Sequence, residues 1–182
     1  REPGPLTAEG VALIKAMGQL GFTLNLSHMD EVAYMQALDR YDGPIVASHS
    51  NAHRLVPRDS NRFLSDAMID GLLARNGIIG VVPLNSFLEA DWAKGGDRSS
   101  VPLDRLADQI DYYCQRAGDA LHVAIGSDLD GGHGIESLPD GLDSIADLSK
   151  LVPMLEARGY SDEDINHIFY GNWARHLTHS LP

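Results

Sequence analysis

His28, His49 and Asp128 each end an apolar, strand-like segment of the chain. Helix-like segments lie between these strands, so strand and helix alternate along the sequence, as they do in parallel α/β sheets. In an α/β barrel the carboxyl ends of the strands form the catalytic face. The pattern therefore predicts βα units that bring two imidazoles and one carboxylate to the same edge of a parallel sheet.

The apolar periodicity predicts an initial helix followed by four strand–helix units. The expected strands are residues 22–28, 45–48, 78–82 and 122–128. Four strands make a small open sheet or half of an eight-stranded barrel. The polar strand ends favour the second, so the predicted fold class is α/β, with parallel strands forming half of a TIM-like (β/α)8 barrel.

Side chains that can accept hydrogen bonds mark the expected helix starts. Thr7, Asp30 and Ser65 are predicted to cap the first three helices, because an oxygen at this position accepts from an unpaired backbone N–H. The remaining helices are expected over residues 103–117, over residues 145–158, after Ser161 with Asp164 as capping-box partner, and after Asn172 as a cap. Residues 51–62 and 85–101 are expected to be irregular loops.

Composition and charge exclude several function classes. The chain of 182 residues has a net charge of −12 and no cluster of Lys and Arg, which argues against nucleic-acid binding. No apolar run is long enough to span a bilayer. Cys114 is the only cysteine, which excludes an intrachain disulfide and predicts a buried thiol. The single cysteine and the lack of a signal-peptide pattern favour a cytoplasmic location.

The two strand-end histidines predict a metal site. Neutral imidazole is a good ligand for zinc, but a catalytic zinc ion usually has three protein ligands and a water. Asp128 or His53 could supply the third ligand, and so could residues upstream of Arg1. An EF-hand that starts at Asp128 is excluded, because its twelfth position is Pro139 and not Glu. An aspartate beside a metal is better suited to carry protons during hydrolysis.

Several ordered motifs resemble one known family. They include Asn-Leu-Ser-His at residues 25–28, Pro-Ile-Val-Ala-Ser-His-Ser-Asn-Ala at residues 44–52 and Gly-Ser-Asp-Leu-Asp-Gly at residues 126–131. Further matching segments are residues 5–10, 62–66, 77–81, 138–142 and 171–175. Together they resemble the renal (membrane) dipeptidase family of metal-dependent peptidases, whose fold is an amidohydrolase-like (β/α)8 barrel. The resemblance covers nearly the whole chain.

The resemblance implies a role for each of four residues. His28 and His49 would be terminal ligands of one ion in a site of two divalent metal ions, expected to be Zn²⁺. Arg62 would bind the C-terminal carboxylate of a dipeptide substrate, and Asp128 would pass a proton to the leaving amine. Phe63 follows Arg62 where the family often has Asn, so Arg54 and Arg58 stay open as alternatives for the carboxylate.

The family's other ligands are not found in this sequence. A His-x-Asp pair on the first strand and a metal-bridging Glu precede this region in the family, so neither is expected within a chain that begins at Arg1. We therefore expect residues 1–182 to be the C-terminal half of one metallohydrolase domain. The N-terminal half of the same protein would be its partner and would supply the remaining ligands, and the intact protein is expected to form a homodimer.

Two other functions stay open at this stage. One is a catalytically inactive scaffold or binding protein that keeps the barrel fold without a full metal site. The other is an amidohydrolase-type enzyme that acts on N-acyl amino acids or lactones. The presence of upstream ligands would separate an enzyme from a scaffold, and a substrate screen would separate the two enzymes.

Overall fold

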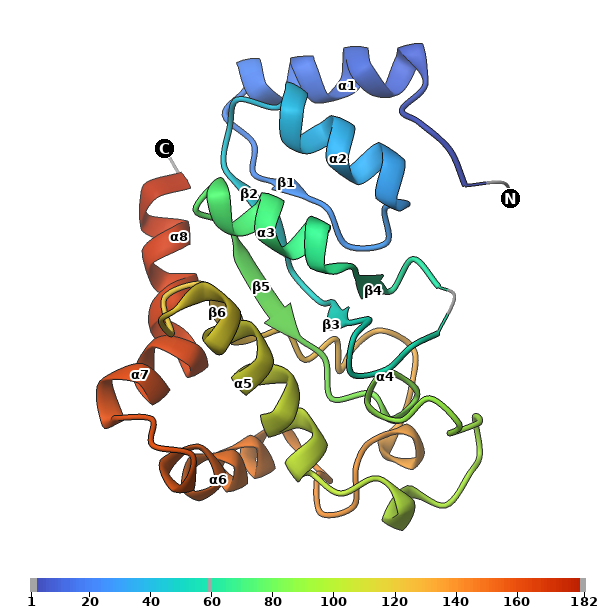
Figure 1. The fold of residues 1–182 in the computed structure, drawn as a ribbon, viewed down its shortest axis with the longest axis vertical. Helices are drawn as coiled ribbons and strands as arrows, with labels where there is room; N and C mark the ends of the chain where they lie inside the picture. The colour runs from blue at the N-terminus through green and yellow to red at the C-terminus, as the bar shows by residue number, and fades with distance from the viewer. Residues whose placement is uncertain (1–2, 59, 181–182) are drawn as a thin grey trace.

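Four short parallel strands form the central sheet of the computed structural model, which describes residues 3–58 and 60–180 (Figure 1). The strands are β1 (Leu24–Asn25), β2 (Ile45–Ala47), β5 (Ile78–Val81) and β6 (Val123–Ile125). They lie in the order β1-β2-β5-β6, and each neighbouring pair is parallel. The predicted parallel sheet of four adjacent strands is thereby confirmed, with β1 and β6 at its two edges.

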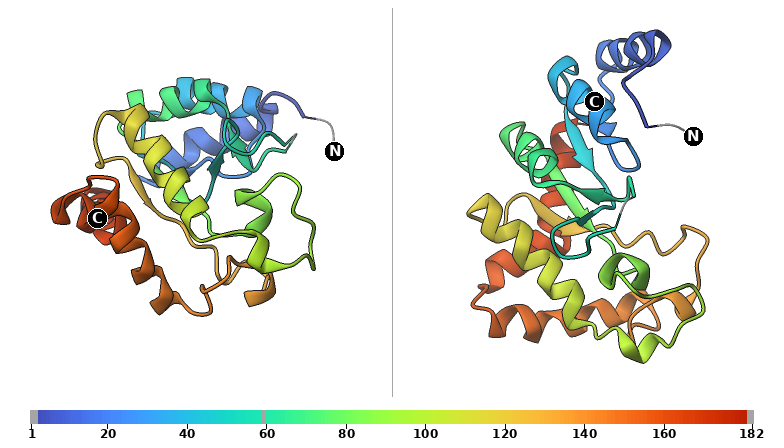
Figure 2. Two further views of the ribbon diagram at one scale, coloured as in Figure 1. Left: turned by 60° about the horizontal axis from the view of Figure 1, so that its bottom comes forward. Right: turned by 45° about the vertical axis from the view of Figure 1, so that its right-hand side comes forward.

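Helices follow the strands in the predicted alternation and pack beside the sheet (Figure 2). The α-helices are α1 (Ala8–Gln19), α2 (Glu31–Arg40), α3 (Asp66–Ala74), α4 (Asn85–Leu88), α5 (Asp104–Ala117), α6 (Leu151–Ala157), α7 (Asp162–Asn166) and α8 (Asn172–Ser180). Among the described residues there are also three short 3-10 helices (Arg98–Ser100, Ile135–Ser137, Ile145–Lys150) and one π-helix (His167–Gly171). None of the helices in the described part of the chain is long and apolar enough to cross a membrane.

The two faces of the sheet pack against different partners, because side chains alternate between the faces of a strand. Ile79 and Val123 belong to the main core, which also contains buried side chains of α2, α3 and α5. Their strand neighbours Ile78 and Ala124 form a smaller cluster with Val46 on the other face, and Trp173 from α8 packs against it. Every residue of β5 is buried, as the apolar run predicted.

Local capping explains where several helices begin. Thr7 Oγ1 accepts from Gly10 N at 3.1 Å, and Ser65 Oγ accepts from Met68 N at 3.3 Å. The predicted capping box of Ser161 is also present, with both reciprocal hydrogen bonds formed. Asp30 occupies the N-cap position of α2 as expected, but its side chain makes no capping hydrogen bond.

Four sequence-based expectations were wrong in detail. The loop over residues 51–62 begins with strand β3 (Asn51–Ala52), which pairs with β4 (Phe63–Leu64) in a separate two-stranded parallel sheet. The loop over residues 85–101 contains α4 and a 3-10 turn, and the helix expected from residue 145 starts as a 3-10 helix. Asn172 does not act as a cap, because its buried Nδ2 donates to Ala120 O and Val123 O. Strands β3 and β4 and helix α4 are too short to show the apolar periodicity from which an element is predicted.

Cys114 is buried in α5, as predicted. Burial raises the pKa of its thiol to about 12, because the thiolate loses its hydration in the core. A thiol held neutral in this way is a poor nucleophile at neutral pH. The residue therefore has a packing role.

Two glycines allow three strand ends to approach closely. A Cβ at Gly80, one residue before the end of β5, would lie 1.9 Å from the carbonyl oxygen of Ser48, and a Cβ at Gly126 would lie equally close to the same oxygen. Ser50 N donates to Gly80 O at 2.8 Å in the same place. The carboxyl ends of β2, β5 and β6 therefore meet because no side chain separates their backbones.

We predict that Gly80→Ala lowers the free energy of unfolding of the complete gene product by more than about 2 kcal/mol, because the backbone must move to admit the methyl group. Urea denaturation measures the change. The matched control is Gly4→Ala, where nothing lies within 4 Å of the added carbon and the change should stay within about 0.5 kcal/mol. Equal stability of the two variants would contradict the close approach.

Candidate metal centre

His28 and His49 meet at the carboxyl ends of β1 and β2. Their Nε2 atoms lie 2.6 Å apart, and their ring centroids lie 4.7 Å apart at an interplanar angle of 69°. His28 is exposed and His49 is half-buried. The structure therefore brings together the two imidazoles that the sequence pattern placed at adjacent strand ends.

Left-handed backbone conformations occur at two of the predicted site residues. His28 has a φ of 71° and Asp128 has a φ of 49°, and Asn76 is the other non-glycine residue with positive φ in the described part of the chain. Such conformations are uncommon for residues with a side chain and are concentrated at functional sites. Each residue lies three positions after the end of its strand, since β1 ends at Asn25 and β6 ends at Ile125.

A polar network holds His49 in place. Its backbone N donates to Ser27 Oγ at 3.0 Å, and its Nδ1 lies 2.7 Å from Ser48 Oγ. Asn25 joins the two serines, because its Oδ1 accepts from Ser27 N and Ser48 N, each at 3.1 Å. In the tautomer where Nδ1–H donates to Ser48, Nε2 has its lone pair directed toward His28. Hydrogen bonds of this kind commonly orient metal-binding histidines.

A positive and a neutral side chain contact His28. The Nη1 atom of Arg62 lies against the His28 ring, and Asn61 Nδ2 donates to the His28 carbonyl at 2.8 Å. Partial burial is the main cause that lowers the pKa of His28, followed by the positive charge of Arg62 and by His49, whereas the charge of Asp128 acts in the opposite direction. The neutral imidazole, which is the form that binds metals, is therefore favoured.

The pair fits part of a metal-ligand set. An ion about 2.0–2.1 Å from each nitrogen with tetrahedral angles would separate the two Nε2 atoms by roughly 3.3 Å, so the rings need to open by less than about 1 Å. Within residues 3–58 and 60–180, no group of three or more His, Cys, Asp or Glu side chains could hold an ion. Neither Asp128 nor His53 therefore completes a three-ligand site with the pair, although the sequence had allowed either to do so.

The three arginines of the loop over residues 51–62 have different surroundings. Arg62 lies beside the histidine pair, whereas Arg58 Nη1 donates to Ser86 O at 3.0 Å in a separate pocket. Arg54 is exposed. Of the three candidates for carboxylate binding, Arg62 is therefore the one in contact with a predicted metal ligand.

Asn51 organises this edge of the sheet in a way that the sequence did not reveal. Its fully buried side chain accepts from Val82 N at 2.9 Å through Oδ1. Its Nδ2 donates to Val82 O at 3.0 Å and to Phe87 O at 2.9 Å. Asn51 therefore holds the segment after β5, at Val82, and helix α4, at Phe87, against strand β3. The sequence placed Asn51 within a family motif but gave no sign of its hydrogen-bond partners, which lie more than 30 positions away.

The parallel βα units with imidazoles at their carboxyl ends are the arrangement expected of half an α/β barrel. The sequence model of the family described as membrane dipeptidase (peptidase family M19) matches residues 1–180. The chain belongs to this family. The resemblance identified from the motifs is thereby confirmed.

Solved structures confirm the fold class. A metallo peptidase from Rhodobacter sphaeroides, crystallised with a phosphinate mimic of the dipeptide L-Ala-D-Ala, is 28% identical and has a TM-score of 0.80. The match covers 99% of this chain and 50% of that one. A second structure, of the M19 metallo peptidase dipeptidase AC, is also 28% identical, with a TM-score of 0.81 over 99% of this chain and 51% of that one.

Curated relatives are also longer than this chain. An uncharacterised protein in the pqqA 5′ region of Klebsiella pneumoniae is 37% identical over 177 residues, which are 97% of this chain and 62% of the relative. The dipeptidase tcpJ of Claviceps purpurea is 30% identical over 172 residues, which are 94% of this chain and 38% of the relative. The chain thus spans about half the length of the proteins it matches.

We predict that Asn51→Ala lowers the free energy of unfolding by about 2 kcal/mol or more, because it leaves the Val82 N–H and two carbonyl oxygens without their partner. Chemical denaturation of the complete gene product gives the value. Asn166→Ala, at an exposed position in α7, should change it by less than about 0.5 kcal/mol. A loss no larger than that of the control would show that Asn51 does not hold this edge.

Proposed function

We propose that the protein containing this chain hydrolyses dipeptides in a site of two divalent metal ions, with His28 and His49 as ligands of one of them. The observation that carries the proposal is the convergence of their Nε2 atoms, 2.6 Å apart, at the carboxyl edge of the sheet. Family membership and the names of the dipeptidases that it matches support it. The ions, which we propose to be Zn²⁺, would lower the pKa of a water and polarise the scissile carbonyl.

Arg62 and Asp128 would act on the substrate itself. Arg62 presents a planar guanidinium beside His28, which suits bidentate binding of the C-terminal carboxylate of a dipeptide. A carboxylate bound there would place the peptide bond close to the histidine pair. Asp128 lies three residues after the end of β6, close enough for its charge to act on His28, and would pass a proton to the leaving amine.

The rest of the barrel is the partner that we propose for this chain. Strands β1 and β6 each have one neighbour in the sheet, which leaves a hydrogen-bonding edge on both sides. Large apolar side chains near β1 are also exposed, among them Leu20 at 75% and Phe22 at 54%. An N-terminal half of the same protein would cover both features and supply the missing ligands, and two complete barrels would form a homodimer.

A scaffold with the same fold is the competing function. It is favoured by one observation, that the described residues hold two candidate ligands in one place and not three. A scaffold of this kind would bind no stoichiometric metal when the complete gene product is purified. Metal content therefore separates the two functions directly.

We expect His28→Ala and His49→Ala each to reduce the bound metal of the complete protein by about one ion per chain. Each should also lower kcat/KM for Ala-Ala by at least about 100-fold, because the ion would lose one of its few protein ligands. Elemental analysis and a ninhydrin assay of the released amino acids measure the two effects. His179→Ala, at an exposed position in α8, is the matched control. Full metal content in both site variants would reject these ligands.

Arg62→Lys should raise KM for dipeptides by about tenfold and change kcat less, because a carboxylate contact is similar in the ground state and the transition state. Steady-state kinetics with Ala-Ala tests this, and Ala-Ala amide, which lacks the carboxylate, serves as the control substrate. The amide should be hydrolysed equally by both proteins. An unchanged KM for Ala-Ala would transfer the role to Arg54 or Arg58.

A further inference from the structure

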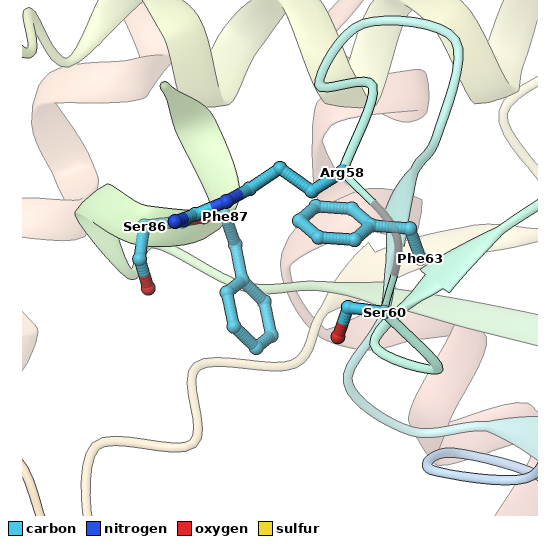
Figure 3. Close-up of a pocket in the computed structure, with 5 residues that line it drawn as sticks. All are labelled: Arg58, Ser60, Phe63, Ser86 and Phe87. Carbon is cyan, nitrogen blue, oxygen red and sulfur yellow. The ribbon is translucent and has the colours of Figure 1, made fainter. Parts of the chain in front are cut away.

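A cavity lies between the segment that follows β3 and helix α4 (Figure 3). It has a volume of about 390 Å³ and is lined by Arg58, Ser60, Phe63, Ser86 and Phe87. Its walls come from the loop that follows β2 and from α4, which follows β5. Both segments follow strands of the central sheet, β2 and β5, and the predicted metal ligand His49 also follows β2.

The cavity combines apolar walls with a positive charge. The rings of Phe63 and Phe87 are 5.4 Å apart at an angle of 51° and form one wall, while Arg58 extends past Phe63 toward Ser86 (Figure 3). One N–H of Arg58 donates to Ser86 O, out of the five that a guanidinium carries. Among the described residues, no carboxylate forms an ion pair with Arg58, although the chain as a whole carries a charge of −12. The remaining donors are available to an anionic ligand.

Three consecutive residues connect this cavity to the site. Ser60, at its rim, accepts from Arg62 N at 3.3 Å. Asn61 donates to the carbonyl of His28, and the side chain of Arg62 contacts the His28 ring. Phe63 is the next residue in the chain and lines the cavity. A substrate whose terminal carboxylate lies on Arg62 would therefore bind next to the segment, residues 60–63, that also contributes Ser60 and Phe63 to the cavity.

We propose that this cavity is a specificity pocket for the acidic side chain of a C-terminal Glu or Asp residue. The proposal rests on the dipeptidase activity proposed above. The phenylalanine rings would pack against the methylene groups of the side chain, and the guanidinium of Arg58 would accept its carboxylate in a charge-assisted, bidentate contact. The hydroxyl groups of Ser60 and Ser86 can donate further hydrogen bonds to the same oxygens.

An apolar side chain would use the cavity less well. It would pack against the two rings but would cover the guanidinium without providing acceptors, and an unpaired charged donor is costly to desolvate. Glutamine has the shape of glutamate and lacks its charge. The comparison of Ala-Glu with Ala-Gln therefore isolates the contribution of Arg58.

The test is steady-state kinetics of the complete gene product on Ala-Glu, Ala-Gln, Ala-Phe and Ala-Ala. We expect kcat/KM for Ala-Glu to exceed that for Ala-Gln by at least about tenfold, mainly through KM. Arg58→Gln should bring this ratio to about one, and a thermal melt that matches the wild-type protein shows that the variant folds. Arg58→Lys keeps the charge without the planar fork and should give an intermediate ratio. Arg40→Gln, exposed at the end of α2, should change nothing.

The proposal is overturned if the wild-type protein does not distinguish Ala-Glu from Ala-Gln, if Arg58→Gln keeps the distinction, or if Ala-Phe is the preferred substrate. If no dipeptide is hydrolysed, the proposed activity is wrong. Calorimetric binding of Ala-Glu and Ala-Gln to the same proteins then tests the pocket by itself. Tighter binding of Ala-Glu that disappears in Arg58→Gln would keep the pocket as an acidic-ligand site. Equal binding would reject the pocket as well.

Discussion

The close packing of the Ser48 carbonyl against Gly80 and Gly126 is the constraint on which the rest of this structure depends. A single added carbon at either glycine would lie 1.9 Å from that oxygen, so the backbones of β2, β5 and β6 can meet only where no side chain intervenes. His49 follows Ser48, and Asp128 follows Gly126 by two residues. The contact therefore sets the relative position of an imidazole and a carboxylate that are far apart in sequence.

From this contact a chain of hydrogen bonds extends across the site. Asn25 and Ser27 connect the end of β1 to Ser48 and His49, which places His28 next to His49. On the other side of the pair, Asn61 and Arg62 bring the following loop to His28 and to the pocket of Arg58. Residues 60–63 thus connect the proposed metal ligands and the proposed carboxylate-binding Arg62 to the cavity lined by Arg58.

Much of the fold could be predicted because it depends on local signals. Apolar runs located the four strands, and capping residues such as Ser65 and Ser161 located helix starts. The strands β3 and β4 and the buried role of Asn172 depend on contacts between distant segments, which no local pattern records. In the site, the sequence placed His28 and His49 together because parallel strands share an edge. It did not reveal Asn51 or the surroundings of Arg58, whose partners lie about 30 positions away.

The central claim is that His28 and His49 bind one metal ion at this edge. A crystal structure of the complete gene product with anomalous data at the zinc edge tests it most directly. The account predicts an anomalous peak about 2.0–2.1 Å from a ring nitrogen of both histidines, with further ligands from residues outside this chain. A peak bound by only one of the two histidines, or located away from both, would contradict it.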